Sequence, residues 1–511
     1  MSFSFILKAV APLAVGLLAA SSPARSQVRA TTTVRIDAAK PHQTIANFAA
    51  SDAWAGQFVG NWPTAKKEAI ADLLFSQDKG IGLSMWRFNI GAGSAEQGEA
   101  SGIKDEWRRA ESFLTPAGSY DFTRQAGQLW FLKAAQQRGV KQFLGFLNSP
   151  PVSLTTTGKA YAKGGETNLA PANYAALGTY CAKVVQGVKQ ATGITFDYLS
   201  PINEPQWDWS DGGQEGSPFR NPEIAGVAKA TAAALAAQRL PTKVLVSEAG
   251  KLDYLFTTAD KPGRGDQLTA FFGDKAAPTY LGDTPQVASI MAGHSYFTTS
   301  PAATAIATRR QLAARVAALK GISYWQSEYC ILGDNAGEIN GGPRDLGMKP
   351  ALYLAKAVHY DLAVGNATAW QWWLAISPYD YKDGLVYIDK NNTDGTYQPS
   401  KMLWALGNYS RYLRPGAVRL DAQLADSART GQPLVSAYKS SNGKQLITVV
   451  VNDYDTPATV QLVLSGGRRL GAGKAYITSA TADLQPGASV PAGQPLQVAP
   501  RSIATLVSEL R

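Results

Sequence analysis

The sequence predicts a (β/α)8 barrel, the TIM-barrel architecture of the α/β class, followed by a C-terminal antiparallel β-sandwich side domain. Two observations lead to this prediction. Across residues 43–412, short apolar runs rich in β-branched and aromatic residues alternate with longer runs of helical spacing. After Pro415-Gly416 the helical runs stop, and alternating strand-like segments continue to the C-terminus.

The short apolar runs predict the barrel strands. Strand–helix alternation implies parallel strands with right-handed crossovers, and eight such units can close into a barrel. The predicted strands lie near residues 43–49, 83–90, 141–147, 197–202, 243–248, 288–296, 322–328 and 367–375.

The longer runs predict the helices of the barrel. Asp121 is expected to cap the first turn of the 123–138 helix, and Gly193 is expected to end the 171–190 helix. A short helix is expected within 265–273. The other predicted helices lie near residues 64–76, 222–238, 302–319, 348–364 and 400–413.

An open, doubly wound sheet is the alternative to a barrel. Such sheets commonly carry a glycine-rich phosphate loop after a strand. The best match, Gly91-Ala92-Gly93-Ser94-Ala95-Glu96, lacks the third glycine of that motif. The barrel is therefore the favoured architecture.

Residues 416–511 predict the β-sandwich. Segments at 433–438, 445–451, 458–464 and 502–507 alternate between apolar and polar residues and are separated by Gly, Asn and Pro. Thr33 to Asp37 also alternates but has no place in the barrel. We therefore expect residues 27–42 to hold an N-terminal strand that joins the sandwich.

Residues 1–26 resemble a signal peptide, with Lys8 before a short apolar stretch and Ala24-Arg25-Ser26 as a cleavage site. The stretch is too short to span a bilayer, although a membrane-anchored N-terminus is the alternative. We therefore expect an exported protein, secreted or periplasmic, with no membrane span after removal of the signal.

The charge pattern argues against a nucleic-acid partner. Loss of Lys8 and Arg25, with no acid lost, lowers the formal net charge from +10 to +8. The remaining basic residues are dispersed and form no block of the kind that marks a nucleic-acid face. A mildly basic surface is compatible with an acidic polysaccharide.

Cysteine and histidine are scarce. Cys181 and Cys330 are the two cysteines, and both are expected to be buried free thiols. His42, His294 and His359 are the three histidines, and neither H-E-x-x-H nor C-x-x-C occurs. The sequence therefore predicts no metal site and no cofactor.

Three predicted barrel strands end in a carboxylate. Glu204 follows the fourth strand, Glu248 the fifth and Glu328 the seventh, and catalytic groups of barrels sit at these strand ends. Hydrolysis of a glycosidic bond needs two carboxyl groups, one on each side of the bond. Glu204 and Glu328 form the favoured pair because their strand ends face each other across the barrel mouth; a structural ion pair is the alternative for each.

An ordered set of motifs resembles glycoside hydrolase family 30 of clan A, especially its endo-β-1,6-galactanase-like branch. The resemblance runs from about Val34 to the C-terminus. The Ala46 to Ser51 run departs from it, because the family has a glycine-richer run there. The motifs are Trp86-Arg87-Phe88-Asn89-Ile90-Gly91-Ala92-Gly93, Asn148-Ser149-Pro150-Pro151, Ile202-Asn203-Glu204-Pro205, Pro205-Gln206-Trp207-Asp208-Trp209, Gln214-Glu215-Gly216-Ser217-Pro218, the lone Glu328 and Trp370-Gln371-Trp372-Trp373.

The resemblance implies a role for each site residue. Glu204 is the implied general acid/base and Glu328 the implied nucleophile. Asn203 is expected to bind the sugar 2-hydroxyl, Arg87 to stabilise the charge of Glu328, and Tyr296 to donate a hydrogen bond to Glu328. The remaining substrate-binding candidates are His294, which can contact sugar or a neighbouring carboxylate, Trp207 and Trp372 as stacking platforms, Trp54, and Glu248, which is substrate-binding or structural. Trp373 is expected in the core because it points away from Trp370 and Trp372.

The implied activity is a retaining hydrolysis of β-linked polysaccharide, with β-1,6-galactan side chains of arabinogalactan as the leading substrate. β-1,6-Glucan, xylan and glucosylceramide-like lipids are the alternatives among glycosidases. A catalytically inactive carbohydrate-binding barrel is the alternative of another class. A monomer that acts on a polysaccharide or oligosaccharide is expected.

Overall fold

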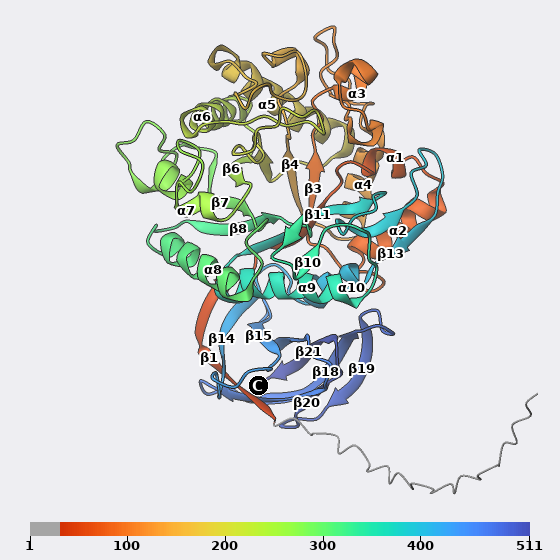
Figure 1. Ribbon diagram of the computed structural model, residues 1–511, viewed down its shortest axis with the longest axis vertical. Helices are drawn as coiled ribbons and strands as arrows, with labels where there is room; N and C mark the ends of the chain where they lie inside the picture. Colours follow the sequence, from red (N-terminus) through yellow and green to blue (C-terminus); the bar gives the residue numbers. More distant parts are fainter. Residues whose placement is uncertain (1–30) are drawn as a thin grey trace, which may run out of the picture.

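The computed structural model describes residues 31–511, in which a closed parallel barrel lies beside a second, smaller sheet (Figure 1). The predicted signal peptide, residues 1–26, and the start of the predicted N-terminal strand, residues 27–30, lie outside the described residues. Among the described residues, no helix is both long enough and apolar enough to cross a bilayer.

The barrel strands pair in chain order, and the eighth strand pairs with the first as well as with the seventh, so that the sheet closes; Ala369 lies opposite Asn47 on one side and Trp325 on the other. This confirms the predicted (β/α)8 fold class. The strands are β2 (Asn47–Ser51), β3 (Met85–Asn89), β4 (Gln142–Phe146), β5 (Tyr198–Ser200), β6 (Lys243–Ala249), β7 (Val287–His294), β8 (Ser323–Glu328) and β11 (Ala369–Ser377). Strands β12 (Gly384–Ile388) and β13 (Tyr397–Pro399) extend the sheet beyond β11.

Helices surround the barrel, and most of them bury one face. In α5, Leu177, Cys181, Val184 and Val188 are buried, a spacing that places them on one side of the helix. Gly193 ends α5 with a φ of 78°, a left-handed conformation that glycine adopts without strain. The long helices are α2 (Thr64–Phe75), α4 (Ala126–Gln137), α5 (Tyr174–Thr192), α6 (Asn221–Ala237), α8 (Ala302–Ala317), α9 (Met348–His359) and α10 (Lys401–Ser410).

Short elements fill the connections. Between β6 and β7 the chain forms α7 (Asp253–Phe256) and a π-helical turn, η5 (Thr269–Gly273), in place of one longer helix. The others are α1 (Gly56–Val59), α3 (Ser94–Gln97), η1 (Gly98–Ser101), η2 (Glu106–Arg108), η3 (Val152–Leu154), η4 (Pro171–Asn173), η6 (Tyr360–Val364), β9 (Asp334–Asn335) and β10 (Ile339–Asn340).

The predicted cap at Asp121 is wrong. Helix α4 begins at Ala126, after Gln125 in a left-handed conformation with a φ of 50°. Asp121 instead accepts hydrogen bonds from the backbone N–H and the hydroxyl of Thr123, at 2.9 and 2.6 Å. The side chain thus stabilises a turn that precedes the helix, a role that aspartate performs as readily as capping.

The second sheet follows the barrel. It contains nine strands in the order β19-β18-β21-β16-β15-β14-β1-β17-β20, and it curls so that apolar side chains of β1, β16, β17 and β21 share one core. Strand β1 is antiparallel to β14 but parallel to β17. The strands are β1 (Thr32–Thr44), β14 (Val418–Leu424), β15 (Leu434–Lys439), β16 (Gln445–Asn452), β17 (Ala458–Ser465), β18 (Leu470–Thr478), β19 (Gln485–Val490), β20 (Leu496–Val498) and β21 (Ser502–Leu510).

Helices α9 and α10 lie between the barrel and the second sheet (Figure 1). Asn408 of α10 and Thr505 of β21 are both buried there. The Asn408 amide donates to the Thr505 hydroxyl at 3.0 Å, and that hydroxyl donates to the Asn408 carbonyl at 2.6 Å. These bonds satisfy polar groups that the contact removes from water.

A buried ion pair outside the barrel provides a stability test. Arg309 of α8 donates to Asp361 at 2.8 Å, and both side chains are fully buried. Arg309→Ala leaves Asp361 without its cation, so we expect a loss of about 3–5 kcal/mol in the free energy of unfolding by urea. Arg310→Ala, at the exposed neighbouring position, should change it by less than about 0.5 kcal/mol. Equal losses in the two variants would show that the ion pair is not the cause.

Candidate active site

The ends of five barrel strands bring five charged side chains together at one mouth of the barrel. Arg87 comes from β3, Glu248 from β6, His294 ends β7 and Glu328 ends β8. Glu204 follows β5, which stops after three residues at Pro201 because proline has no N–H for the sheet. All five side chains are buried.

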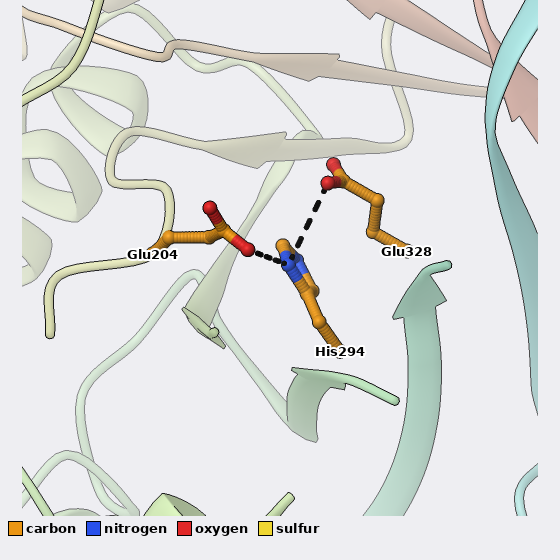
Figure 2. Close-up of side chains that lie close together, drawn as sticks. All are labelled: Glu204, His294 and Glu328. Carbon is orange, nitrogen blue, oxygen red and sulfur yellow. Dashed lines mark hydrogen bonds and ion pairs between the residues drawn. The ribbon is translucent and has the colours of Figure 1, made fainter. Parts of the chain in front are cut away.

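His294 lies between the two predicted catalytic carboxylates (Figure 2). Its Nδ1 is 2.9 Å from Glu204 Oε1 and 3.7 Å from Glu328 Oε1. Its Nε2 is 3.1 Å from Glu248 Oε2. One carboxylate oxygen of Glu204 lies within 4.8 Å of one of Glu328.

The charges around His294 keep it protonated. Burial acts to lower the pKa of His294, but Glu328, Glu204 and Glu248 outweigh burial and raise this pKa to about 9. At neutral pH the ring is therefore an imidazolium that donates from Nδ1 to Glu204 and from Nε2 to Glu248.

The pKa values of Glu204 and Glu248 are shifted in opposite directions. Burial raises the pKa of Glu204; His294 opposes that shift, and the charge of Glu328 adds to it. Burial alone would also raise the pKa of Glu248, but Arg87 and His294 together hold this pKa below its ordinary value. Glu204 therefore keeps a proton more readily than Glu248, whose carboxylate lies beneath it.

Arg87 ties Glu328 to the cluster. Its guanidinium bonds Glu328, lies 3.6 Å from Glu248 and donates to Asn203 Oδ1 at 3.4 Å. It also lies over the ring of Phe146, 3.9 Å from the centroid. Tyr296 donates to the other oxygen of Glu328 at 2.8 Å. Glu328 is thus oriented by a cation on one side and a hydroxyl on the other.

Several residues around the site have a left-handed backbone. Glu204 has a φ of 45°, Glu248 of 55°, Trp209 of 54° and Phe297 of 57°. This conformation is unfavourable for residues with a Cβ and persists where the surroundings enforce it, often at functional sites. The backbone of Glu204 is fixed by a hydrogen bond from its N–H to the Glu248 carbonyl at 2.8 Å.

A cleft of about 740 Å³ opens over Glu204 and Glu328. Asn203, Tyr296, Trp207 and Trp54, all predicted from the sequence, line it. The lining residues outside the predicted site set are Arg108, Trp209, Gln214, Phe297, Cys330, Leu332, Trp373, Tyr379, Asp380, Tyr381 and Asp383. The Tyr379-Asp380-Tyr381 run after the eighth strand is the signal that could have identified part of this set.

The sequence pattern assigned the wrong tryptophan of the eighth barrel strand to the cleft. Trp372 is fully buried outside the barrel, where its Nε1 donates to the Asp383 carbonyl at 2.7 Å, so it offers no ring to a sugar. Trp373 lines the cleft instead. Trp370 and Trp372 do share a face, as alternation requires, but both faces of a barrel strand are buried, so alternation does not tell which one faces inward.

Glu248 lies beneath the cleft rather than in it. Its side chain is fully buried, bonded to His294 and Ser327, and does not line the cavity. Of the two alternatives for Glu248, substrate-binding or structural, this burial favours the structural one. His294 is likewise fully buried and contacts the carboxylates.

Cys181 and Cys330 are free and buried, as the sequence predicts.

Ligand atoms of Glu204, His294 and Glu328 lie close enough together to surround one cation. Both ring nitrogens of His294, however, are already bonded to carboxylates, and its raised pKa favours the protonated ring. A metal ligand must be a neutral imidazole with a free nitrogen. The chemistry of these donors therefore favours an ion-paired cluster over a metal site.

The protonation of His294 predicts how stability depends on pH. The pKa of His294 is about 9 in the folded chain against 6.5 as an ordinary value. A raised pKa stabilises the fold fully below the unfolded value, and this contribution is lost as pH rises through the folded value. We expect the free energy of unfolding to fall by on the order of 3 kcal/mol between about pH 6.5 and pH 9 from this group.

Urea unfolding at pH 6 to 10 measures this loss. His294→Gln, which cannot take up the proton, should not show this loss in the free energy of unfolding. His359→Gln is the matched control, because burial lowers the pKa of His359 to about 4 and its own component lies between about pH 4 and 6.5. An unchanged pH dependence in His294→Gln would contradict a protonated His294.

Comparisons with known proteins agree with this geometry. The sequence model of O-Glycosyl hydrolase family 30 matches residues 31–387. The glucuronoxylanase XynC of Bacillus subtilis (strain 168) is 29% identical over 140 residues, which span 27% of this chain and 29% of that protein. The chain thus aligns with less than a third of the length of this relative.

Solved structures share the whole architecture. A conserved exported protein from Bacteroides fragilis is 31% identical, with a TM-score of 0.85 over 93% of this chain and 100% of that one. The GH30 xylanase C of Talaromyces cellulolyticus is 20% identical, with a TM-score of 0.68 over 93% and 99%. An endo-β-1,6-glucanase is 17% identical, with a TM-score of 0.65 over 93% and 94%. At these low identities, the last two structures show only that the fold is shared. With the family match over most of its length and two buried glutamates at the ends of strands four and seven, the chain belongs to glycoside hydrolase family 30 and is an O-glycosyl hydrolase.

Proposed function

We propose that this hydrolase cleaves its substrate with retention of configuration, through a covalent intermediate on Glu328. One observation carries the proposal: carboxylate oxygens of Glu204 and Glu328 lie within 4.8 Å of each other. The two carboxyl groups are roughly 5–5.5 Å apart in retaining glycosidases and roughly 6.5–9.5 Å apart in inverting ones, which need room for a water molecule.

The environments of the two glutamates support their separate roles. Glu204, whose pKa is raised by burial, is suited to hold the proton that the leaving oxygen receives. Glu328, bonded to Arg87 and Tyr296, is suited to act as an anion with a fixed orientation. Two cations, Arg87 and His294, then balance two anions, Glu248 and Glu328, and Glu204 stays neutral.

The reaction follows from this arrangement. Glu328 attacks the anomeric carbon while Glu204 gives its proton to the glycosidic oxygen, and the bond to the leaving sugar breaks. Glu204, now an anion, removes a proton from water, and that water releases the sugar from Glu328. The Asn203 amide lies beside Arg87 and can donate to the 2-hydroxyl of the sugar, a contact that strengthens in the transition state.

The shape of the cleft supports action on a polymer. Trp207 and Trp209 line both the cleft and a second hollow of about 520 Å³. Trp207 packs edge-on against the exposed Phe297, at 6.2 Å between ring centroids. Their apolar ring faces suit the C–H faces of successive sugar units, which supports endo cleavage.

The substrate that we propose is a β-1,6-linked galactan, such as the side chains of arabinogalactan. Support comes from the resemblance of residues 148–151, 205–209 and 214–218 to the galactanase-like branch, because these segments follow strands three and four beside the cleft. The partial likeness to a glucuronoxylanase favours xylan as the alternative, and the fold is also shared with a β-1,6-glucanase.

Export is part of the same proposal. A polysaccharide substrate lies outside the cytoplasm, residues 1–26 have the pattern of a signal peptide, and a similar structure is that of an exported protein. We propose that the mature chain acts in the periplasm or outside the cell.

Azide rescue distinguishes the two glutamates. Glu204→Ala should still form the intermediate with a 2,4-dinitrophenyl glycoside, which needs no proton donor, and azide should then give a β-glycosyl azide. Glu328→Ala should lose turnover and give only the α-glycosyl azide, because azide enters where the nucleophile stood. Proton NMR identifies each product.

Wild-type enzyme is the control for the azide experiment and should release a β-configured product first. An α-configured first product would reject Glu328 as the nucleophile. If the two alanine variants exchanged behaviours, the two roles would be reversed.

Substrate choice is tested by kcat/KM on β-1,6-galactan, β-1,6-glucan and xylan of matched chain length. A polar site built for the axial 4-hydroxyl of galactose leaves buried groups unpaired when glucose binds, so galactan should exceed glucan by roughly 10⁴-fold. Comparable or better turnover of glucan or xylan would show that galactan is not the preferred substrate. The proposed roles of the two glutamates would be unaffected.

A further inference from the structure

Three asparagines form a hydrogen-bonded row at the ends of neighbouring barrel strands. Asn89 is the last residue of β3, Asn148 comes shortly after β4, and Asn203 shortly after β5. The Asn203 amide donates to Asn148 Oδ1 at 3.1 Å, and the Asn148 amide donates to Asn89 Oδ1 at 3.2 Å. All three side chains are buried. The row exists because β3, β4 and β5 are adjacent in the barrel.

Arg87 sets the direction of the row. A guanidinium carries donors and no acceptor, so the Asn203 atom that faces Arg87 at 3.4 Å is the amide oxygen. The Nδ2 group of Asn203 therefore faces Asn148, which presents its oxygen and directs its own Nδ2 group toward Asn89. The opposite orientation of the Asn148 amide would bring two donors together. Each amide of the row thus has one orientation that satisfies its neighbours.

Asn148 is the closer of the two partners of the Asn203 side chain. The bond from Arg87 is long, since N–H···O bonds are usually about 2.9–3.0 Å. The same guanidinium also bonds Glu328 and lies 3.6 Å from Glu248. Asn203 is therefore held mainly from the Asn148 side.

The far end of the row is anchored through the backbone of Asn89. Its N–H donates to Asp52 Oδ1 at 2.7 Å, and its carbonyl accepts from Gln125 and Gln128, at 2.9 Å each. The three side chains that make these bonds are buried. Asn148 is thus bonded to a residue whose own position is fixed.

Of the three asparagines, Asn203 lines the cleft, whereas Asn148 and Asn89 do not. Asn148 accepts one hydrogen of Asn203 Nδ2, and the other hydrogen is engaged by no further hydrogen bond within residues 31–511. That second N–H is the donor available to a sugar hydroxyl.

We propose that Asn148 is a positioning residue for the reaction: it holds the Asn203 amide so that the second N–H points at the 2-hydroxyl of the sugar that Glu328 attacks. The inference rests on the proposed function, in which Asn203 makes that contact. Asn148 acts without touching the substrate, so its effect is confined to sugars that carry the 2-hydroxyl. The contact strengthens in the transition state, where a misplaced donor costs most.

Removal of the 2-hydroxyl from the substrate isolates this effect. The probes are two 4-nitrophenyl β-glycosides of the disaccharide unit of the polymer that wild type cleaves fastest. One is complete, and the other lacks the 2-hydroxyl on the sugar bonded to nitrophenol. The measured quantity is the ratio of kcat/KM on the complete probe to kcat/KM on the deoxy probe. Because one enzyme sample acts on both probes, any loss of folded enzyme cancels from this ratio.

Asn148→Leu and Asn148→Ala both remove the acceptor for Asn203, and each should lower the ratio by about 10-fold. The deoxy probe should be cleaved almost as fast as by wild type. Asn148→Asp keeps an oxygen toward Asn203 and should retain most of the ratio. A ratio as low in Asn148→Asp as in Asn148→Leu would contradict the role of the acceptor.

Double variants show whether Asn148 acts through Asn203. Asn203→Ala should lower the ratio further than Asn148→Leu does. The combination of the two substitutions should give the same ratio as Asn203→Ala alone, because no amide is left to be positioned. Additive losses in the double variant would show that Asn148 acts by another route.

Asn408→Leu is the matched control, because Asn408 is a buried, hydrogen-bonded asparagine at the contact with the second sheet. It should leave the ratio unchanged. A wild-type ratio or equal losses on both probes in the Asn148 variants, with a lowered ratio in Asn203→Ala, would overturn this inference alone. An unchanged ratio in Asn203→Ala would overturn the proposed contact with the 2-hydroxyl, and the inference with it.

Discussion

The balance of buried charge at the barrel mouth is the constraint on which the site depends. Arg87 and His294 are fully buried cations, and Glu248 and Glu328 are the carboxylates bonded to them. An uncompensated charge there would be expensive, because water cannot solvate it. Burial raises the pKa of Glu204, and the charge of Glu328 adds to that shift, whereas His294 opposes it. In the proposed mechanism, this raised pKa keeps on Glu204 the proton that the leaving oxygen receives.

The barrel frame allows such a cluster of buried charges to form. Its strands satisfy their own backbone hydrogen bonds, so five strand ends can place charged side chains at one mouth from positions far apart in the chain. Arg87 and Glu328, for example, are 241 residues apart. The rigid frame also maintains unfavourable backbone geometry, since Glu204 and Glu248 both lie in the left-handed region and are joined by a backbone hydrogen bond.

Above the charge cluster, the cleft is lined largely by aromatic side chains. Trp207, Trp209 and Phe297 offer apolar ring faces, which bind many sugars with little discrimination.

The sequence by itself determined the barrel, its strand order and the pair of glutamates at its mouth, because these depend on local periodicity and on charged residues that close apolar runs. It could not decide which face of β11 points inward, so Trp372 and Trp373 were exchanged, and it left open whether Glu248 binds substrate or lies beneath the cleft. It also gave no sign of Phe297 or Asp383, which reach the cleft from loops. Only the tertiary structure decided these points, since alternation fixes which side chains share a face, whereas barrel closure and the course of the loops fix where that face lies.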